Sequence, residues 1–128
     1  MEVLERRRDT LPVRYVQVDD GWYDRWGSWE PNAKFGGDMK AYADEVRRRG
    51  FLPGIWLAPF GASVEAPVYK EHPEWFVRRP DGSAWSAPWP SIDYSHPEAR
   101  AHMAALFHKI SYDWGFRYIK MDIISPTL

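Results

Sequence analysis

The sequence of 128 residues has no cysteine, no long apolar run and no excess of either charge. Without cysteine, the chain has neither a disulfide framework nor a thiolate metal site. No stretch approaches the roughly 18 apolar residues of a membrane helix, and the N-terminus MEVLERRRDT lacks the apolar region of a signal peptide. The 17 basic and 18 acidic side chains provide no concentrated positive field for nucleic acid. We therefore expect a cytoplasmic domain that binds neither membranes nor nucleic acid.

The sequence also lacks the local signatures of several enzyme classes. It contains no Walker loop and no Gly-x-Ser-x-Gly elbow, which argues against nucleotide hydrolysis and acyl transfer. His72 and His96 each precede a proline, while His102 and His108 are six residues apart on an expected helix and do not share a face. This spacing is not typical of a metal site, so no metal or other cofactor is expected.

Aromatic residues, in contrast, make up 16% of the chain. The eight tryptophans are Trp22, Trp26, Trp29, Trp56, Trp75, Trp85, Trp89 and Trp114. Most of them lie outside strongly periodic segments, where large rings bury poorly, so stacking on a ligand such as a sugar ring is one explanation. The alternative is that they fill the core beneath long connections. Both explanations stay open for any single tryptophan.

Three short apolar runs predict buried strands that end abruptly in polar or turn residues. They cover residues 13–18, 51–57 and 116–121. Helical patterns lie at residues 2–9, before the first run, and at residues 39–49 and 95–114, between the runs. Asp38 is the expected N-cap of the second helix, and Ser95 with Glu98 predicts a capping box for the third. Strands separated by helices indicate a parallel sheet.

Residues 61–92 contain five prolines and three tryptophans and predict a loop-rich insertion, with a hairpin turn at Asp81 and Gly82. The repeating strand–helix unit indicates an α/β fold. The first strand continues as Asp-Asp-Gly-Trp, without the glycine-rich loop of a doubly wound sheet, which favours part of a (β/α)₈ TIM barrel. Three strands cannot close a barrel. We therefore expect either a longer polypeptide or a half-barrel that pairs its open strand edges with another molecule, as in a homo-oligomer.

Carboxylates follow two of the three expected strands, at the ends that form the floor of the site in parallel α/β folds. Asp19 and Asp20 follow the first strand, and Asp122 follows the third, with Lys120 two residues earlier on the same face. The functional interpretation is a carboxylate nucleophile or base at Asp122, with Lys120 lowering its pKa. The alternatives are a strand-capping salt bridge between Lys120 and Asp122 and a simple Asp-Gly turn after Asp19.

Three stretches together resemble the α-galactosidase (melibiase) clan of retaining glycoside hydrolases, nearest to the family 36 type. They are VQVDDGW at 16–22, GFLPGIWLAPF at 50–60 and RYIKMDI at 117–123, and the segments that join them match in register. The resemblance implies that residues 1–128 supply the N-terminal half of a catalytic (β/α)₈ barrel, from its first helix to its fourth strand. The implied activity is hydrolysis of terminal α-galactosides by a retaining double displacement.

The resemblance also implies a role for each site residue. Asp122 would be the nucleophile, Lys120 the donor to a sugar hydroxyl, and Asp19 and Asp20 the acceptors that recognise a galactose-type ring. Trp22 and Trp56 would line the pocket for a galactose-containing oligosaccharide or glycoside. The nucleophile must be ionised to attack the anomeric carbon, and a neighbouring ammonium favours that state.

Two features depart from the family. The general acid would lie on a later strand, beyond Leu128, and the residues after Asp122, Ile-Ile-Ser-Pro-Thr-Leu, lack the polar continuation of close α-galactosidases. The departures leave two alternatives to hydrolysis. One is a transglycosylase that passes the galactosyl unit to another sugar. The other is a truncated half-barrel that binds sugar or self-associates without turnover.

Overall fold

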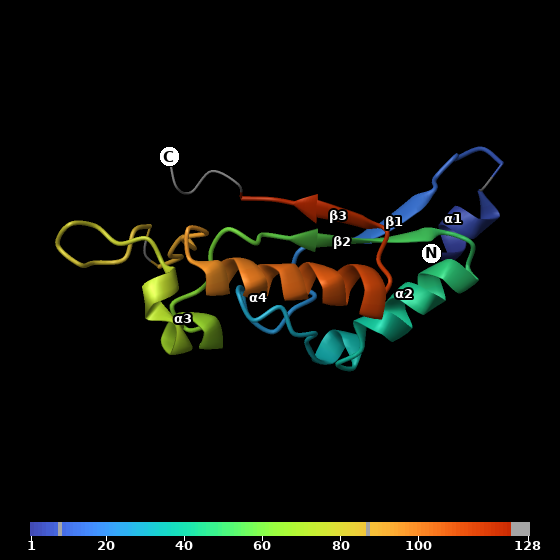
Figure 1. The fold of residues 1–128 in the computed structure, drawn as a ribbon. Helices are drawn as coiled ribbons and strands as arrows, with labels where there is room; N and C mark the ends of the chain where they lie inside the picture. The colour runs from blue at the N-terminus through green and yellow to red at the C-terminus, as the bar shows by residue number, and fades with distance from the viewer. Residues whose placement is uncertain (8, 87, 124–128) are drawn as a thin grey trace.

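The structure is a computed structural model that describes residues 1–7, 9–86 and 88–123. The expected insertion at 61–92 lies inside these ranges except for residue 87. Of the segment 123–128, which departs from the family pattern, only residue 123 lies inside them. Strands β1 (Tyr15–Val18), β2 (Leu52–Leu57) and β3 (Tyr118–Met121) form one sheet, and helices α2 (Met39–Arg48) and α4 (Pro97–His108) lie on the same face of it (Figure 1). A further short helix, α1 (Glu2–Arg6), precedes the sheet.

The sheet has the order β1-β2-β3, and both pairs of neighbouring strands are parallel. Val18 lies beside Ile55, and Trp56 lies beside Lys120. The α/β class with a parallel sheet is therefore confirmed. Consecutive strand order with helices on one face is the arrangement found in (β/α)₈ barrels, whereas a doubly wound sheet carries helices on both faces. The described strands do not close on themselves, so the barrel stays a prediction.

Helix α2 begins where the sequence predicts. The side chain of Asp38 accepts a hydrogen bond from the backbone N–H of Ala41, which satisfies one of the unpaired donors of the first turn. The helix buries Met39, Ala43 and Val46 against the sheet. Its apolar side chains recur every three or four residues, which explains why this helix was predictable.

The predicted capping box at Ser95 and Glu98 is wrong. The N-cap of α4 is His96, no side chain caps the helix, and Pro97 is its first residue. Proline has no N–H group and therefore needs no capping partner at this position. The N–H of Ser95 instead donates to the Asp93 carboxylate, within the turn that precedes the helix. At its other end, α4 continues as a π-helical turn, η3 (Lys109–Asp113), rather than as regular α-helix.

The insertion is more ordered than a loop. It contains the short helix α3 (Pro67–Glu71) and a 3₁₀ turn, η2 (Pro73–Trp75). Isolated antiparallel bridges join Gly61 to Ser91, Phe76 to Ile92 and Arg78 to Ala84. Asp81 and Gly82 lie at the tip of the last hairpin, as predicted, and Gly82 has a φ of 83°. The insertion projects from the end of the sheet at which the strands finish (Figure 1).

The main hydrophobic core lies between the sheet and the two helices. Its fully buried members include Met39, Ala43, Ile55, Leu57 and Ile110. Each large apolar side chain buried in this way stabilises the fold by roughly 1.5–3 kcal/mol. A smaller cluster beneath the insertion contains Val68, Trp75, Phe76 and Ala99. Because the core occupies the helix side of the sheet, the polar side chains of the strands, Gln17 and Lys120, lie on the other side.

The face of the sheet opposite the helices carries a different set of side chains. Tyr15 and Tyr118 lie across β2 from each other with ring centres 5.8 Å apart. Gly54 makes this close approach possible, because a Cβ atom there would lie 2.9 Å from the Tyr118 ring.

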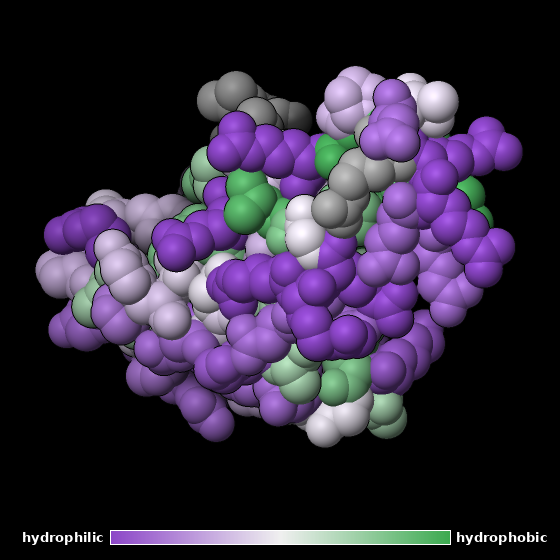
Figure 2. All heavy atoms as spheres, turned by 90° about the vertical axis from the view of Figure 1, so that its right-hand side faces the viewer, coloured by the Kyte–Doolittle hydropathy of each residue, from purple (hydrophilic) through white to green (hydrophobic). Residues whose placement is uncertain are grey.

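The end of the molecule from which the strands start is mainly hydrophilic, with a few apolar residues (Figure 2). Within the described residues, no helix is both long and apolar enough to span a membrane.

Candidate active site at the strand ends

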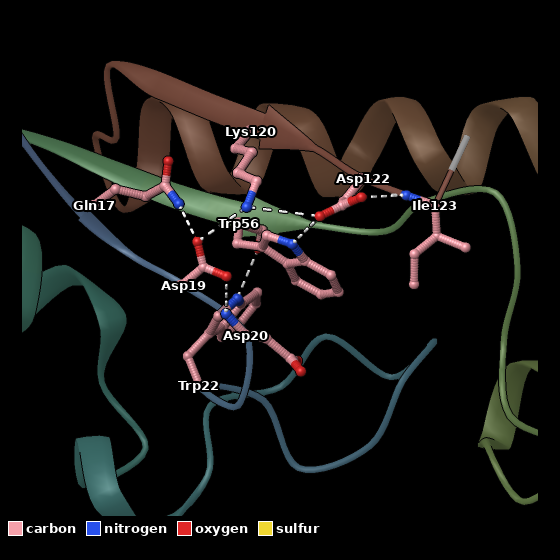
Figure 3. A network of polar contacts seen from close by, with 8 residues as sticks. All are labelled: Gln17, Asp19, Asp20, Trp22, Trp56, Lys120, Asp122 and Ile123. Carbon is pink, nitrogen blue, oxygen red and sulfur yellow. Dashed lines mark hydrogen bonds and ion pairs between the residues drawn. The ribbon is translucent and has the colours of Figure 1, made fainter. Parts of the chain in front are cut away.

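The predicted polar residues meet at the carboxyl ends of the strands (Figure 3). Asp19 and Asp20 follow β1, Lys120 lies within β3, and Asp122 directly follows β3. Residues alternate between the two faces of a strand, so Lys120 and Asp122 share the face that the helices leave open. Four of the six residues named from the sequence are thus brought to one end of the sheet.

Lys120 links the carboxylates of the two outer strands. Its Nζ atom lies 3.2 Å from Oδ2 of Asp19 and 3.6 Å from Oδ2 of Asp122. These ion pairs hold the pKa of Lys120 above its usual range, with the hydrogen bond to Asp19 as the main cause. The three side chains are each about half exposed, so solvent can reach the ammonium and both carboxylates. The cluster is therefore a preformed ionic site open to a ligand.

Both oxygens of Asp122 are held by donors. The indole N–H of Trp56 donates to Oδ2 at 3.0 Å, and the backbone N–H of Ile123 donates to Oδ1 at 2.8 Å. These hydrogen bonds, with the Lys120 ammonium, lower the pKa of Asp122, and the bond from Trp56 is the largest cause. Ile123 has a φ of 50°, a rare conformation for a β-branched residue. The carboxylate is thus ionised and fixed in orientation.

Asp19 is occupied by neighbouring groups of the protein. Its Oδ2 accepts from the amide of Gln17 at 2.6 Å and from Lys120, and its Oδ1 accepts from the backbone N–H of Asp20 at 2.9 Å. The backbone hydrogen bond is the largest cause of its lowered pKa, followed by Lys120. Asp19 therefore orients Lys120 as well as offering an acceptor to a ligand.

We expect Lys120→Met to raise the pKa of both Asp19 and Asp122, because the variant removes the positive charge that favours their ionised forms. Carboxylate carbon chemical shifts measured by NMR during an acid titration would report both groups. In the parent protein, the pKa values of Asp19 and Asp122 are lowered by folding, so both carboxylates stabilise the folded state at pH values above the usual aspartate range. This stabilisation is lost as the pH falls through their pKa values in the folded state. The variant should lose less stability over that acidic interval.

Lys109→Met is the matched control for this titration. Lys109 is similarly exposed and pairs with Glu30 at 2.9 Å, away from the strand ends. Its loss should leave the titrations of Asp19 and Asp122 unchanged. Equal shifts in the two variants, or none in Lys120→Met, would contradict the role of Lys120.

Asp20 has different surroundings from Asp19. Its Oδ1 accepts a hydrogen bond of 2.6 Å from the hydroxyl of Tyr23, and its side chain lines a cavity of about 450 Å³. Burial raises the pKa of Tyr23, and the hydrogen bond to Asp20 raises it further, so the hydroxyl stays protonated as a donor. Asp20, rather than Asp19, therefore faces the space next to the ionic site.

The cavity is large enough for a small ligand, since binding pockets commonly measure roughly 300–1,000 Å³. Its walls are formed by Asp20, Tyr23, Trp26, Trp56, Ser86, Trp89 and Ile123. Four of these side chains are aromatic. The cavity and the ionic site are adjacent, because the Trp56 side chain lines the cavity and also donates a hydrogen bond to Asp122.

The structure separates the two tryptophans that were expected to line the pocket. Trp56 does line the cavity, although it is only 4% exposed. Trp22 is fully buried and is not among the lining residues. Its indole N–H donates to the backbone carbonyl of Trp56 at 2.8 Å (Figure 3). Trp22 thus lies in the core behind the cavity wall, because its ring packs between other aromatic side chains.

Several site residues were missed in the sequence. Gln17 precedes Asp19 by two positions and therefore shares its face, the same alternation that linked Lys120 to Asp122. Tyr23, Trp26 and Trp89 form the aromatic walls of the cavity. For Trp89, the sequence left open whether it reaches the site. Only the folded arrangement brings the loop after β1 against the insertion.

The structural alternatives raised from the sequence are also realised. The salt bridge between Lys120 and Asp122 is formed, and Gly21 follows Asp20 with a φ of 90°. These features fix the site geometry and are compatible with a catalytic role. Within the part of the chain that the structure describes, no group of three or more histidine or acidic side chains could hold a metal ion.

Comparison with known proteins identifies relatives of this chain. A family model described as Melibiase matches residues 1–125. An A-type blood α-D-galactosamine galactosaminidase from Flavonifractor plautii is 29% identical over 126 residues, and an α-galactosidase from Lactobacillus acidophilus is 29% identical over 136. An α-galactosidase from Thermus thermophilus, solved in complex with stachyose, superposes with a TM-score of 0.76 at 30% identity.

These matches cover most of this chain but only part of each relative. The alignments span 88% and 96% of the chain for the two curated relatives, and 12% and 18% of their own lengths. The superposition on the Thermus thermophilus enzyme covers 96% of this chain and 29% of that one. The chain therefore corresponds to one segment of much longer proteins.

Proposed function

The chain belongs to the melibiase family, and on this basis we propose that it carries the nucleophile of an enzyme that hydrolyses terminal α-galactosides with retention of configuration. The observation that carries the proposal is the placement of the Lys120 ammonium between the carboxylates of Asp19 and Asp122. An ionised, oriented carboxylate beside an open cavity is what a retaining glycosidase needs for its first step.

In the proposed reaction, an oxygen of Asp122 attacks the anomeric carbon of the galactosyl unit. The bond from that carbon to the leaving oxygen breaks, and the leaving oxygen takes a proton from a carboxylic acid, which gives a covalent galactosyl ester. Water then attacks the same carbon, returns a proton to the second carboxylate and releases Asp122. The hydrogen bonds from Trp56 and Ile123 keep both oxygens of Asp122 in position during these steps.

Recognition of the galactosyl hydroxyls is assigned to Lys120 as a donor and to Asp19 and Asp20 as acceptors. Asp20 lines the cavity and has the more direct access, while Asp19 also holds Lys120 in place. Trp56 contributes a ring to the pocket wall, and Trp22 supports that ring through its hydrogen bond to the Trp56 carbonyl. We assign the general acid to a segment outside these 128 residues, because Asp19 is already engaged with three donors.

A trapping experiment tests the nucleophile directly. The full-length protein would be incubated with a 2,2-difluorinated α-galactosyl donor that carries an activated leaving group, which departs without help from an acid. We expect one covalent adduct, found by mass spectrometry on the peptide that contains Asp122. Excess galactose should protect against labelling, and the gluco-configured donor should not react. An adduct on a different carboxylate would assign the nucleophile elsewhere.

A further inference from the structure

Gln17 is a polar side chain beside the ionic site that takes no part in the proposed chemistry. It lies within β1, between Val16 and Val18, and is partly buried. Residues alternate between the faces of a strand, so Gln17 shares the open face of the sheet with Asp19. Two residues of a strand span roughly 6.6 Å, which the long side chain of glutamine can bridge. Gln17 therefore reaches the Asp19 carboxylate along its own strand.

The amide of Gln17 and the ammonium of Lys120 meet at one oxygen of Asp19 (Figure 3). Nε2 of Gln17 donates to Oδ2 at 2.6 Å, and Nζ of Lys120 lies 3.2 Å from the same atom. The other oxygen, Oδ1, accepts from the backbone N–H of Asp20. An ionised carboxylate only accepts hydrogen bonds, so the nitrogen of the Gln17 amide must face it. Gln17 and the backbone thus fix the rotation of the carboxylate independently of Lys120.

The base of the Gln17 side chain is held close to β2. Gln17 lies beside Gly54 in the register of the sheet, and Gly54 lies beside Tyr118. A Cβ atom at position 54 would lie 3.2 Å from Cβ of Gln17 and 2.9 Å from the Tyr118 ring. The glycine therefore admits both side chains in one row across the sheet. The amide end of Gln17 extends from this row toward the strand ends, where the ion pairs lie.

Lys120 needs a fixed partner on β1. Strand β2 separates β1 from β3, so the ammonium reaches Asp19 across a whole strand. The lysine stem is flexible, and an exposed ion pair by itself holds a side chain only weakly. Nζ already lies 3.6 Å from Asp122, which follows its own strand. If Asp19 rotated away, the ammonium would move onto Asp122 and cover the carboxylate that is proposed to attack.

We propose that Gln17 is a positioning residue, which holds the Asp19 carboxylate so that the Lys120 ammonium stays between Asp19 and Asp122. The inference rests on the proposed function, in which Asp122 attacks and Lys120 donates to a sugar hydroxyl. Gln17 acts through Asp19, since it is not among the residues that line the cavity. Its amide carries no charge, so it anchors the carboxylate without replacing Lys120 as the counter-ion.

Two substitutions in the full-length protein test the amide donor. Gln17→Met keeps the length of the side chain and removes the hydrogen bond, and we expect it to lower kcat/KM for p-nitrophenyl α-galactoside about tenfold at every pH. Gln17→Glu keeps the shape, and the protonated form of the new carboxyl group is still a donor. The neighbouring Asp19 raises the pKa of that group. We therefore expect near-parent activity at acidic pH and a loss as the pH rises through this pKa.

Tyr118→Phe is the matched control. It changes a side chain beside Gly54 in the same row and keeps the ring that faces Tyr15. Its pH profile of kcat/KM should match that of the parent. Parent activity in Gln17→Met, or the same loss at every pH in Gln17→Glu, would overturn the positioning role while leaving the role of Asp122 intact.

An acid titration followed by NMR separates this inference from the proposed function, because it needs no turnover. In Gln17→Met, loss of the donor should raise the pKa of Asp19, and closer approach of the ammonium should lower the pKa of Asp122. Lys120→Met should instead raise both values. If the parent protein hydrolysed no α-galactoside, the catalytic proposal would fail, and opposite shifts in Gln17→Met would still support the positioning role. Any other pattern in Gln17→Met, including unchanged values, would overturn it.

Discussion

Asp122→Ala is expected to reduce turnover of an α-galactoside by about ten-thousandfold or more in the full-length protein. The methyl group cannot form the galactosyl ester, so the low-barrier two-step route is lost. Folding should be preserved, because Asp122 is about half exposed and Lys120 keeps its closer partner, Asp19. Initial rates with p-nitrophenyl α-galactoside, together with circular dichroism, would measure both effects.

Added azide provides a second readout of the same variant. The small anion can enter the space left by the carboxylate and attack the anomeric carbon in its place, so product formation should partly return. Asp113→Ala is a suitable control, because Asp113 is an exposed carboxylate at the opposite end of α4. Near-normal activity of Asp122→Ala without azide would show that the nucleophile is a different group.

Trp22→Ala is expected to lower the free energy of unfolding by about 3–5 kcal/mol. The indole is fully buried and contacts the rings of Tyr23, Trp29 and Trp114 with centres 5.6–6.0 Å away. Its removal leaves a cavity in the core and also deprives the carbonyl of Trp56 of its indole donor. Urea unfolding followed by circular dichroism would measure the loss.

Trp89→Ala provides the comparison for this measurement. Because Trp89 is more than half exposed, its loss should change the free energy of unfolding by less than about 0.5 kcal/mol. The two variants thus separate a tryptophan that stabilises the fold from one that lies exposed in the cavity wall. Similar stability losses in both would contradict this division, as would a stable Trp22→Ala protein.

The sequence was most informative where a regular spacing was involved. Alternation along a strand placed Lys120 and Asp122 on one face, and helical periodicity located α2 from its N-cap at Asp38. It was least informative for Trp22, which follows Asp19 and Asp20 in one short motif. Neighbours in a motif can point in opposite directions after a turn at Gly21, and only tertiary packing decides which of them is buried.

Other features depend on contacts between distant segments. The different surroundings of Asp19 and Asp20 arise from Lys120, about one hundred positions later in the chain, and from Tyr23, three positions later. The contact between the rings of Trp26 and Trp89 needs the insertion to fold against the loop after β1. The false capping box at Ser95 has a local cause, because the Asp93 side chain competed for the same backbone donor.

The pairing of Trp56 with Lys120 across β2 and β3 also limits which insertions and deletions the gene can tolerate. Loss of a single codon within β3 would turn the lysine toward the helices and an apolar neighbour toward the carboxylates, since alternate residues face opposite sides. The hairpin tip at Asp81 and Gly82 has no such constraint and can change in length without moving the strands. Length variation among descendants of this sequence should therefore accumulate in the insertion and be absent from the strands.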